Sequence, residues 1–200
     1  MSLRGTDAYR DVGALPVLVR RAVEAARAHA FAFSCRPEQG RLLQVLAAGA
    51  PHRIAETGTG CGVGLAWLAS GASAGTRLVG VERDAGRARV AADVFRGRDQ
   101  VEILHGDWRR IEEHAPYDLL VLDGGGQAKG DGVADPARLL RAGGTVVVDD
   151  FTPATTWPPR YDGAPDRPRL HWLEHPELHN AELRLAADLS VLVGTRLPPR

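Results

Sequence analysis

The sequence predicts an α/β fold in which one mostly parallel, doubly wound sheet carries helices on both faces. Apolar runs alternate with segments of helical periodicity from residue 53 to residue 149, and continuous apolar runs are typical of parallel strands buried on both sides. A glycine-rich segment joins the first run to the helix after it. Only residues 186–188 separate the last two runs, which is too short for a parallel crossover and predicts an antiparallel C-terminal hairpin.

Each element follows from its residue pattern. Two helices are expected before the sheet, at residues 15–29 and 37–48, where apolar residues recur at helical spacing and a proline suits each first turn. Seven strands are expected at residues 53–57, 77–82, 101–105, 117–123, 144–149, 178–185 and 189–196. Further helices are expected at residues 65–70, 85–95, 108–114, 135–141 and 169–175. The proline-rich residues 152–168 should form a long surface connection.

Composition excludes several classes of protein. The 25 basic and 25 acidic residues give a net charge of zero, which disfavours nucleic acid or an anionic membrane surface as a partner. No run approaches the roughly 18 to 20 apolar residues of a membrane helix, and the N-terminus lacks the apolar segment of a secretory signal. Two cysteines cannot form a disulfide framework. We therefore expect a cytoplasmic protein.

The glycines after the first expected strand form the most informative motif. Glycine at a turn from strand to helix lets the backbone approach a ligand and directs amides of the helix N-terminus toward it. A dinucleotide fingerprint, G-x-G-x-x-G, would need glycine at Val63 if it began at Gly58, or at Leu65 if it began at Gly60. Both registers fail, which disfavours a nicotinamide dinucleotide as the ligand.

The residues that do stand there are Glu56, Thr57, Gly58, Gly60 and Gly62, an acid followed by alternating glycines. This pattern resembles motif I of the class I S-adenosylmethionine-dependent methyltransferases, E/D-x-G-x-G-x-G. The resemblance implies a Rossmann-like fold and a cofactor site formed by these five residues. An acid at the strand end suits a ligand with an α-ammonium group.

Two later positions extend the implied cofactor site. Glu82 ends the second expected strand, where a carboxylate can accept both ribose hydroxyls of a nucleotide, and Arg83 follows it. Gly106, Asp107 and Trp108 follow the third strand, where the resemblance places contacts to adenine. Asp107 could accept from the exocyclic amine and Trp108 could stack on the base, although Trp108 could equally be a core aromatic.

The fourth and fifth expected strands also end in acids. Asp123 and the pair Asp149–Asp150, together with the preceding segment PEQGRLLQVL, resemble the catechol-type, cation-dependent bacterial O-methyltransferases. Strand ends in a doubly wound sheet open into one crevice, and three carboxylates there suit Mg²⁺, Mn²⁺ or Ca²⁺. The resemblance implies an ion that chelates two vicinal oxygens of a phenolic substrate and acidifies the attacked hydroxyl. Alternatively, one aspartate of the pair caps the loop and the other faces solvent.

The match to this family has two departures. The family usually pairs its fifth-strand aspartate with asparagine, whereas here the neighbour is Asp150. It also tends to place a catalytic lysine three residues after the fourth-strand aspartate, where this chain has Gly126. Lys129, the only lysine, lies six residues after Asp123. We expect Lys129 and Asp123 to be catalytic, with Lys129 as the base; the alternative for Lys129 is a solvated loop residue.

The insertion after the fifth strand adds four aromatic side chains, Phe151, Trp157, Tyr161 and Trp172. Rigid aromatics beside the crevice would suit a flat acceptor. They would equally serve to fix a proline-rich loop to the body of the domain. The sequence leaves both possibilities open.

The expected function is transfer of the methyl group of S-adenosylmethionine to a small-molecule acceptor. The methylated group is expected to be a hydroxyl, and the acceptor could be aromatic. We expect one methyltransferase domain with N-terminal helices (1–50), a cofactor-binding core (51–150) and a substrate-side loop with the terminal hairpin (151–200). The N-terminal helices could form a homodimer contact. An NAD(P)-dependent oxidoreductase and a non-catalytic nucleotide-binding module are the alternatives, and the charge balance disfavours a nucleic-acid methyltransferase.

Overall fold

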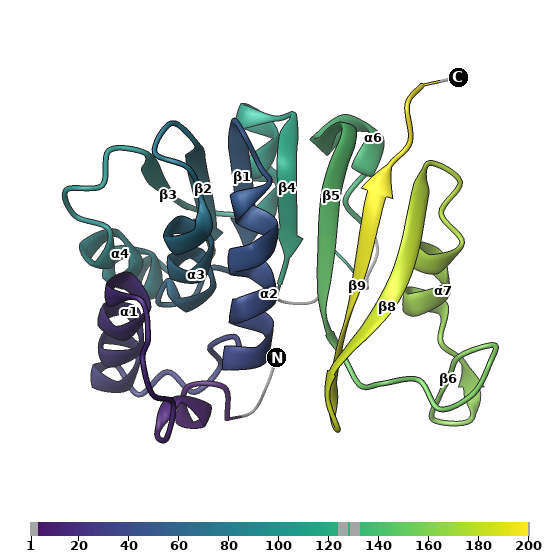
Figure 1. Cartoon of the computed structure of the whole chain (residues 1–200), viewed down its shortest axis with the longest axis horizontal. Helices are drawn as coiled ribbons and strands as arrows, with labels where there is room; N and C mark the ends of the chain where they lie inside the picture. Colours follow the sequence, from purple (N-terminus) through teal and green to yellow (C-terminus); the bar gives the residue numbers. More distant parts are fainter. Residues whose placement is uncertain (1–3, 124–127, 129–132, 200) are drawn as a thin grey trace.

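The computed structural model describes residues 4–123, 128 and 133–199. Within these residues the main sheet has seven strands in the order β3-β2-β1-β4-β5-β9-β8 (Figure 1). Strands β1 to β5 are parallel to one another, and β9 is antiparallel to both β5 and β8. The predicted fold class, including the C-terminal hairpin, is confirmed. The strands are β1 (Arg53–Thr57), β2 (Arg77–Glu82), β3 (Val101–His105), β4 (Tyr117–Leu122), β5 (Leu140–Phe151), β8 (Leu178–Ala186) and β9 (Leu189–Arg196).

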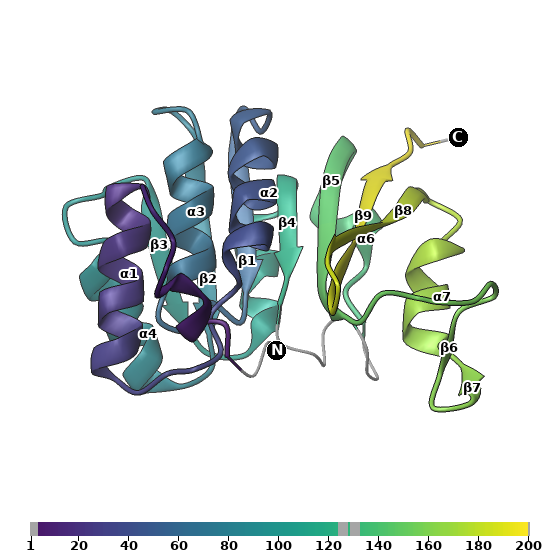
Figure 2. The same ribbon diagram turned by 60° about the horizontal axis from the view of Figure 1, so that its bottom comes forward.

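Helices cover both faces of this sheet (Figure 2). One face carries α1 (Val17–Ala28), α2 (Pro37–Ala48), α3 (Val63–Gly71) and α4 (Ala85–Val94). The other carries the 3-10 helix η2 (Trp108–His114), α6 (Pro136–Leu139) and α7 (Arg167–Leu173). Alternate residues of one strand enter the two cores, with Ile54 in the first and Ala55 in the second. Burial on both faces explains why these strands read as continuous apolar runs.

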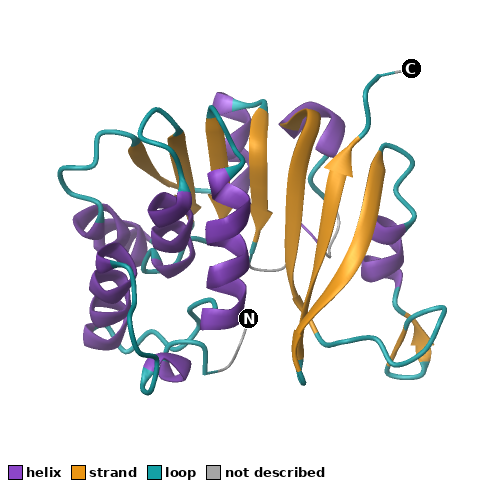
Figure 3. Ribbon diagram, viewed as in Figure 1, coloured by secondary structure: helices purple, strands orange, loops and turns teal. Residues whose placement is uncertain are grey.

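The structure differs from the expected elements mainly after β4. The helix expected at residues 135–141 ends at Leu139, because Leu140 is fully buried and pairs with Tyr117 as the first residue of β5. The proline-rich connection is not wholly irregular. It contains a small hairpin, β6 (Arg160–Tyr161) and β7 (Ala164–Pro165), and α7 begins within it (Figure 3).

The carboxyl ends of β1, β2, β4 and β5 meet at one edge of the sheet, the lower edge in Figure 1. The first turn of α2 and the 3-10 helix η1 (Asp7–Tyr9) lie at the same edge. The chain segments that the sequence singles out are therefore gathered there. In the part of the chain that is described, no helix combines the length and the apolar character needed to cross a bilayer.

Candidate active site

The glycine loop joins β1 to α3 at the carboxyl edge. Gly58, Gly60 and Gly62 have φ values of 72°, 57° and 92°, in a region that residues with a side chain rarely adopt. A Cβ on Gly60 would lie 2.8 Å from the ring of Phe31, which packs over the loop. Backbone shape and close packing therefore both require glycine at Gly60.

Glu56 points from the end of β1 beneath the first turn of α3. Its side chain is 1% exposed, and a Cβ on Gly64 would approach its Oε1 to 2.0 Å. Burial raises the pKa of Glu56 to about 8, although Thr59 and the amide of Leu65 lower it in part. Among the described residues, Oε2 has no hydrogen-bond partner. The carboxylate is thus prepared for a cationic or hydrogen-donating ligand.

Glu82 is also buried, but both of its oxygens are used within the protein. Oε2 accepts from the amide of Gly60 at 2.8 Å. Oε1 accepts from the amide of Asp84 at 2.8 Å and from Arg87 Nη2 at 2.8 Å. Glu82 therefore ties the end of β2 to the glycine loop. Sequence reasoning missed Arg87, because its helical spacing resembles that of the solvated arginines around it.

Two other predicted cofactor residues lie differently from Glu56. Thr57 is fully buried, and its Oγ1 donates to the carbonyl oxygens of Val121 at 3.5 Å and Asp123 at 3.3 Å, so it joins the ends of β1 and β4. Arg83 is exposed to solvent. Thr57 and Arg83 directly follow Glu56 and Glu82 in the sequence, so they adjoin the site through their backbone and not through their side chains.

The segment after β3 begins with Gly106, whose φ is 150° and whose amide donates to the carbonyl of Glu82 at 3.0 Å. Asp107 is exposed and accepts from the amide of Arg109 at 3.0 Å as the N-cap of η2. Trp108 is half-buried, with the Arg109 guanidinium 4.9 Å from its ring centroid. The two readings of Trp108 thus both find support, since it packs on the second core and keeps part of its ring exposed.

The three predicted aspartates lie together. Carboxylate oxygens of Asp123, Asp149 and Asp150 fall within 4.8 Å of one another. Burial, followed by the repulsion of the neighbouring carboxylates, raises the pKa of Asp123 well above its usual value and that of Asp149 to about 6. Asp150 has a φ of 66°, and the pairing of β5 with β9 is irregular between Val148 and Phe151. The strand ends therefore converge as the sequence predicts.

This cluster fits a divalent cation. Its donors are hard carboxylate oxygens, which Mg²⁺, Mn²⁺ and Ca²⁺ prefer. Asp149 is 4% exposed, and its Oδ1 has no partner in the described part of the chain. Lys129, the predicted base, and Gly126 lie outside the described residues.

A segment that sequence reasoning missed covers the glycine loop. We call residues 30–36, between α1 and α2, the cover. Phe31 lies over Gly60 and stacks edge-on against Phe33, with ring centroids 5.8 Å apart. Ser34 and Cys35 are buried beside Glu56 and Asp123 at the same narrow pocket. Thr6 Oγ1 holds the cover by donating to the carbonyl of Phe31 at 2.6 Å. In the sequence, only the pair Phe31 and Phe33, between α1 and α2, could have indicated this role.

The four aromatic residues of the insertion divide between the two predicted roles. Phe151 and Trp172 are 6% and 1% exposed, and Trp172 Nε1 donates to the carbonyl of Ala128 at 2.7 Å. Trp157 and Tyr161 are 75% and 70% exposed. The first pair fixes the insertion to the domain, and the second pair remains available for contacts.

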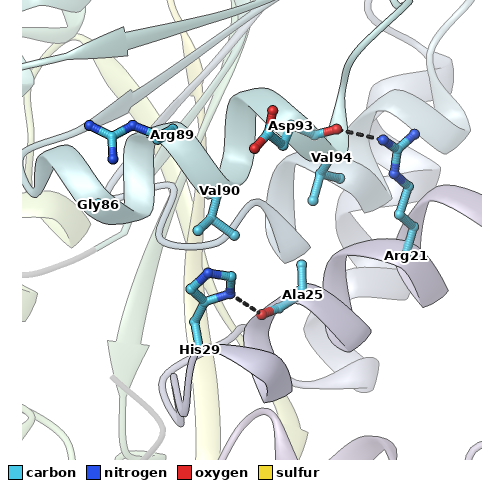
Figure 4. A pocket seen from close by; sticks show the side chains of 8 residues that line it. All are labelled: Arg21, Ala25, His29, Gly86, Arg89, Val90, Asp93 and Val94. Carbon is cyan, nitrogen blue, oxygen red and sulfur yellow. Dashed lines mark hydrogen bonds between the residues drawn. The ribbon is translucent and has the colours of Figure 1, made fainter.

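A separate groove of about 380 Å³ lies between α1 and α4, away from these acids (Figure 4). Two of its polar side chains have partners in the protein: Arg21 Nη2 donates to the carbonyl of Asp93 at 2.5 Å, and His29 Nδ1 bonds to the carbonyl of Ala25 at 2.9 Å. Val90 and Val94 form its apolar wall. The groove offers no counterpart to the buried acids at the strand ends.

Known proteins are similar to this chain in sequence and in fold. Residues 55–151 match the family model described as a methyltransferase domain. A putative O-methyltransferase of Mycobacterium ulcerans is 32% identical over 120 residues, which are 56% of this chain and 54% of that protein. The chain thus spans about half the length of the curated relatives that it matches.

Two solved structures share the fold over nearly the whole chain. The O-methyltransferase of Bacillus cereus, in complex with S-adenosylhomocysteine (SAH), is 22% identical with a TM-score of 0.74, covering 97% of this chain and 96% of that one. TomG of Streptomyces achromogenes, in complex with S-adenosylmethionine, is 22% identical with a TM-score of 0.73 and the same coverage. The predicted resemblance is confirmed. Residues 55–151 thus resemble a methyltransferase domain in sequence, and the chain as a whole has the fold of these S-adenosylmethionine-dependent O-methyltransferases.

Proposed function

We propose that this protein transfers the methyl group of S-adenosylmethionine to a hydroxyl of a small-molecule acceptor, with the help of a divalent cation. The observation that carries the proposal is that Glu56, the glycine loop and Asp123 line one pocket beside the other two aspartates. The names of its relatives, which are O-methyltransferases, support the same activity.

In this proposal Glu56 binds the α-ammonium group of the cofactor. An ammonium beside Oε2 would stabilise the ionised carboxylate and lower its raised pKa. Glu82 binds the ribose hydroxyls through Oε2, which accepts one bond within the protein, whereas Oε1 already accepts three. Asp107 and Trp108 take the adenine, while Gly58, Gly60 and Gly62 let the cofactor approach the backbone.

When bound, the cofactor supplies an electrophilic methyl group, and a divalent cation lowers the pKa of a hydroxyl that it binds. Asp123, Asp149 and Asp150 would hold that cation. The protein's contribution is to position the acceptor oxygen in line with the methyl group. Lys129 is the proposed base that removes the hydroxyl proton.

Three further parts of the proposal concern the setting of the reaction. An aromatic acceptor is supported by Trp157 and Tyr161, which are exposed on the connection that follows the acidic cluster. A homodimer through the N-terminal helices stays a prediction, to which the 68% exposure of Val17 at the start of α1 lends support. A cytoplasmic location likewise stays a prediction.

The test combines binding with turnover. Calorimetry should detect SAH binding, and a catechol panel should be methylated with Mg²⁺ but not with excess chelator. Asp123→Ala should abolish turnover, while Asp99→Ala, at an exposed acid, should not. Binding of NAD without SAH would favour the oxidoreductase, and SAH binding without any methyl transfer would favour a binding module. Turnover that Asp123→Ala leaves unchanged would exclude the cation mechanism.

A further inference from the structure

Gln39 is a buried polar residue in the first turn of α2 that the sequence gives no reason to single out. Its side chain is 1% exposed. Neither Nε2 nor Oε1 has a hydrogen-bond partner among the described residues. A buried amide with two unpaired atoms destabilises a fold, and native proteins keep such a group only where something else satisfies it.

The neighbour of Gln39 is the acidic cluster. The first turn of α2 lies at the carboxyl edge of the sheet (Figures 1 and 2). Its N-cap, Arg36, pairs with Asp188 at 2.8 Å, and β9, which begins at the next residue, pairs with the end of β5 that carries Asp149. The Gln39 amide also lowers the pKa of the Asp149 carboxyl. Asp149 Oδ1 is itself without a partner in the described chain. A donor without an acceptor therefore lies beside an acceptor without a donor.

We propose that Gln39 is a positioning residue for the cation site. Its Nε2 donates to Asp149 Oδ1 when the aspartates hold a cation, which fixes the orientation of that carboxylate and leaves its other oxygen for the ion. Residues that orient metal ligands in this way typically change metal affinity about 10- to 100-fold when they are replaced. This inference rests on the proposed cation site.

A purely structural role predicts a different outcome. If Gln39 only filled space, methionine or leucine would serve as well or better, because either removes two unpaired polar atoms from the interior. Cation affinity would then stay the same. A positioning role instead predicts that the variants keep or gain stability but lose affinity for the cation.

The experiment uses Gln39→Met and Gln39→Leu, with Gln44→Met as the matched control on the same helix. Mn²⁺ affinity is measured by calorimetry on the SAH-bound protein, together with SAH affinity and the melting temperature. We expect both Gln39 variants to lose about 10- to 100-fold in Mn²⁺ affinity, with SAH affinity unchanged and no drop in melting temperature. The control should match the wild type in all three.

A second measurement does not depend on the variants' folding. In the wild-type protein, addition of Mg²⁺ should shift the NMR signals of the Gln39 side-chain amide. Unshifted signals, or unchanged Mn²⁺ affinity in folded Gln39 variants, would overturn the inference. A wild type that binds SAH but not Mn²⁺ would overturn it too, while leaving the cofactor half of the proposed function intact. Failure to bind SAH at all would refute the proposed function itself.

Discussion

Two acidic regions flank the end of β5, and they balance buried charge in different ways. In the first, Arg169 is 4% exposed and pairs with Asp166 at 2.9 Å and Glu182 at 2.6 Å. Burial alone would raise the pKa of Glu182, but hydrogen bonds, chiefly from Arg169, lower it below its usual value. In the second, carboxylate oxygens of Asp123, Asp149 and Asp150 lie within 4.8 Å of one another, and burial raises the pKa of Asp149.

The difference separates a structural cluster from a functional one. The first region satisfies its acids from within the chain, and Arg169 Nη2 also donates to the carbonyl of Thr152 at 2.6 Å. It therefore holds the insertion in place. The second leaves an oxygen of Asp149 without a partner among the described residues, as expected of a site that a ligand completes.

The largest predicted effect comes from breaking the internally balanced region. Arg169→Met would leave Asp166 and Glu182 partly buried without their cation, and breaking a buried pair costs about 3–5 kcal/mol. We expect the free energy of unfolding, measured in urea, to fall by about this amount. Arg109→Met, at an exposed pair with Asp107, should change it by at most about 1 kcal/mol. Equal effects would mean that the two pairs do not differ as described.

The next effect concerns Glu56, the buried acid of the cofactor pocket. Glu56→Gln keeps the shape of the side chain but removes the charge that the proposed ammonium contact needs. Hydrogen bonds to charged groups contribute about 1.5–3 kcal/mol, so SAH should bind roughly 10- to 100-fold more weakly by calorimetry. An unchanged dissociation constant would remove Glu56 from the proposed site.

A smaller effect is the pH dependence of stability. The pKa of Glu56 is about 8 in the folded protein and 4.5 in its reference state, so between these values the folded state holds a proton that the unfolded state releases. Stability of the ligand-free protein should therefore rise as pH falls from 8 toward 5, by at most about 1.4 kcal/mol per pH unit from this group. Urea unfolding of wild type and Glu56→Gln checks this, and the variant should show a flatter profile. A parallel profile would assign the dependence to other groups.

The smallest stability effect is expected at the exposed aromatic residues. Trp157→Ala and Tyr161→Ala remove side chains that are 75% and 70% exposed, and surface changes of this kind usually stay within about 0.5 kcal/mol. The KM for an aromatic acceptor should nevertheless rise, with SAH affinity unchanged. A large loss of stability would show that these residues help to fix the insertion after all.

The carboxyl-edge acids could be predicted because parallel strands impose a simple rule. Once the strands were assigned, Glu56, Asp123 and Asp149 had to meet. The cover and Arg87 could not be predicted, since their positions depend on packing between segments far apart in the chain. Gln39 was hidden for a related reason: a glutamine in an amphipathic helix reads as a surface residue until its burial is known.

The cover has a kinetic consequence. Phe31 closes over Gly60, and the cover is in turn held by the first residues of the chain, where the amide of Thr6 donates to Ala32 and the hydroxyl of Tyr9 donates to the carbonyl of Cys35 at 2.8 Å. Residues 4–9 thereby hold the cover in place over the glycine loop. If the cofactor binds as proposed, we expect removal of residues 4–9, none of which lines the pocket, to speed its exchange.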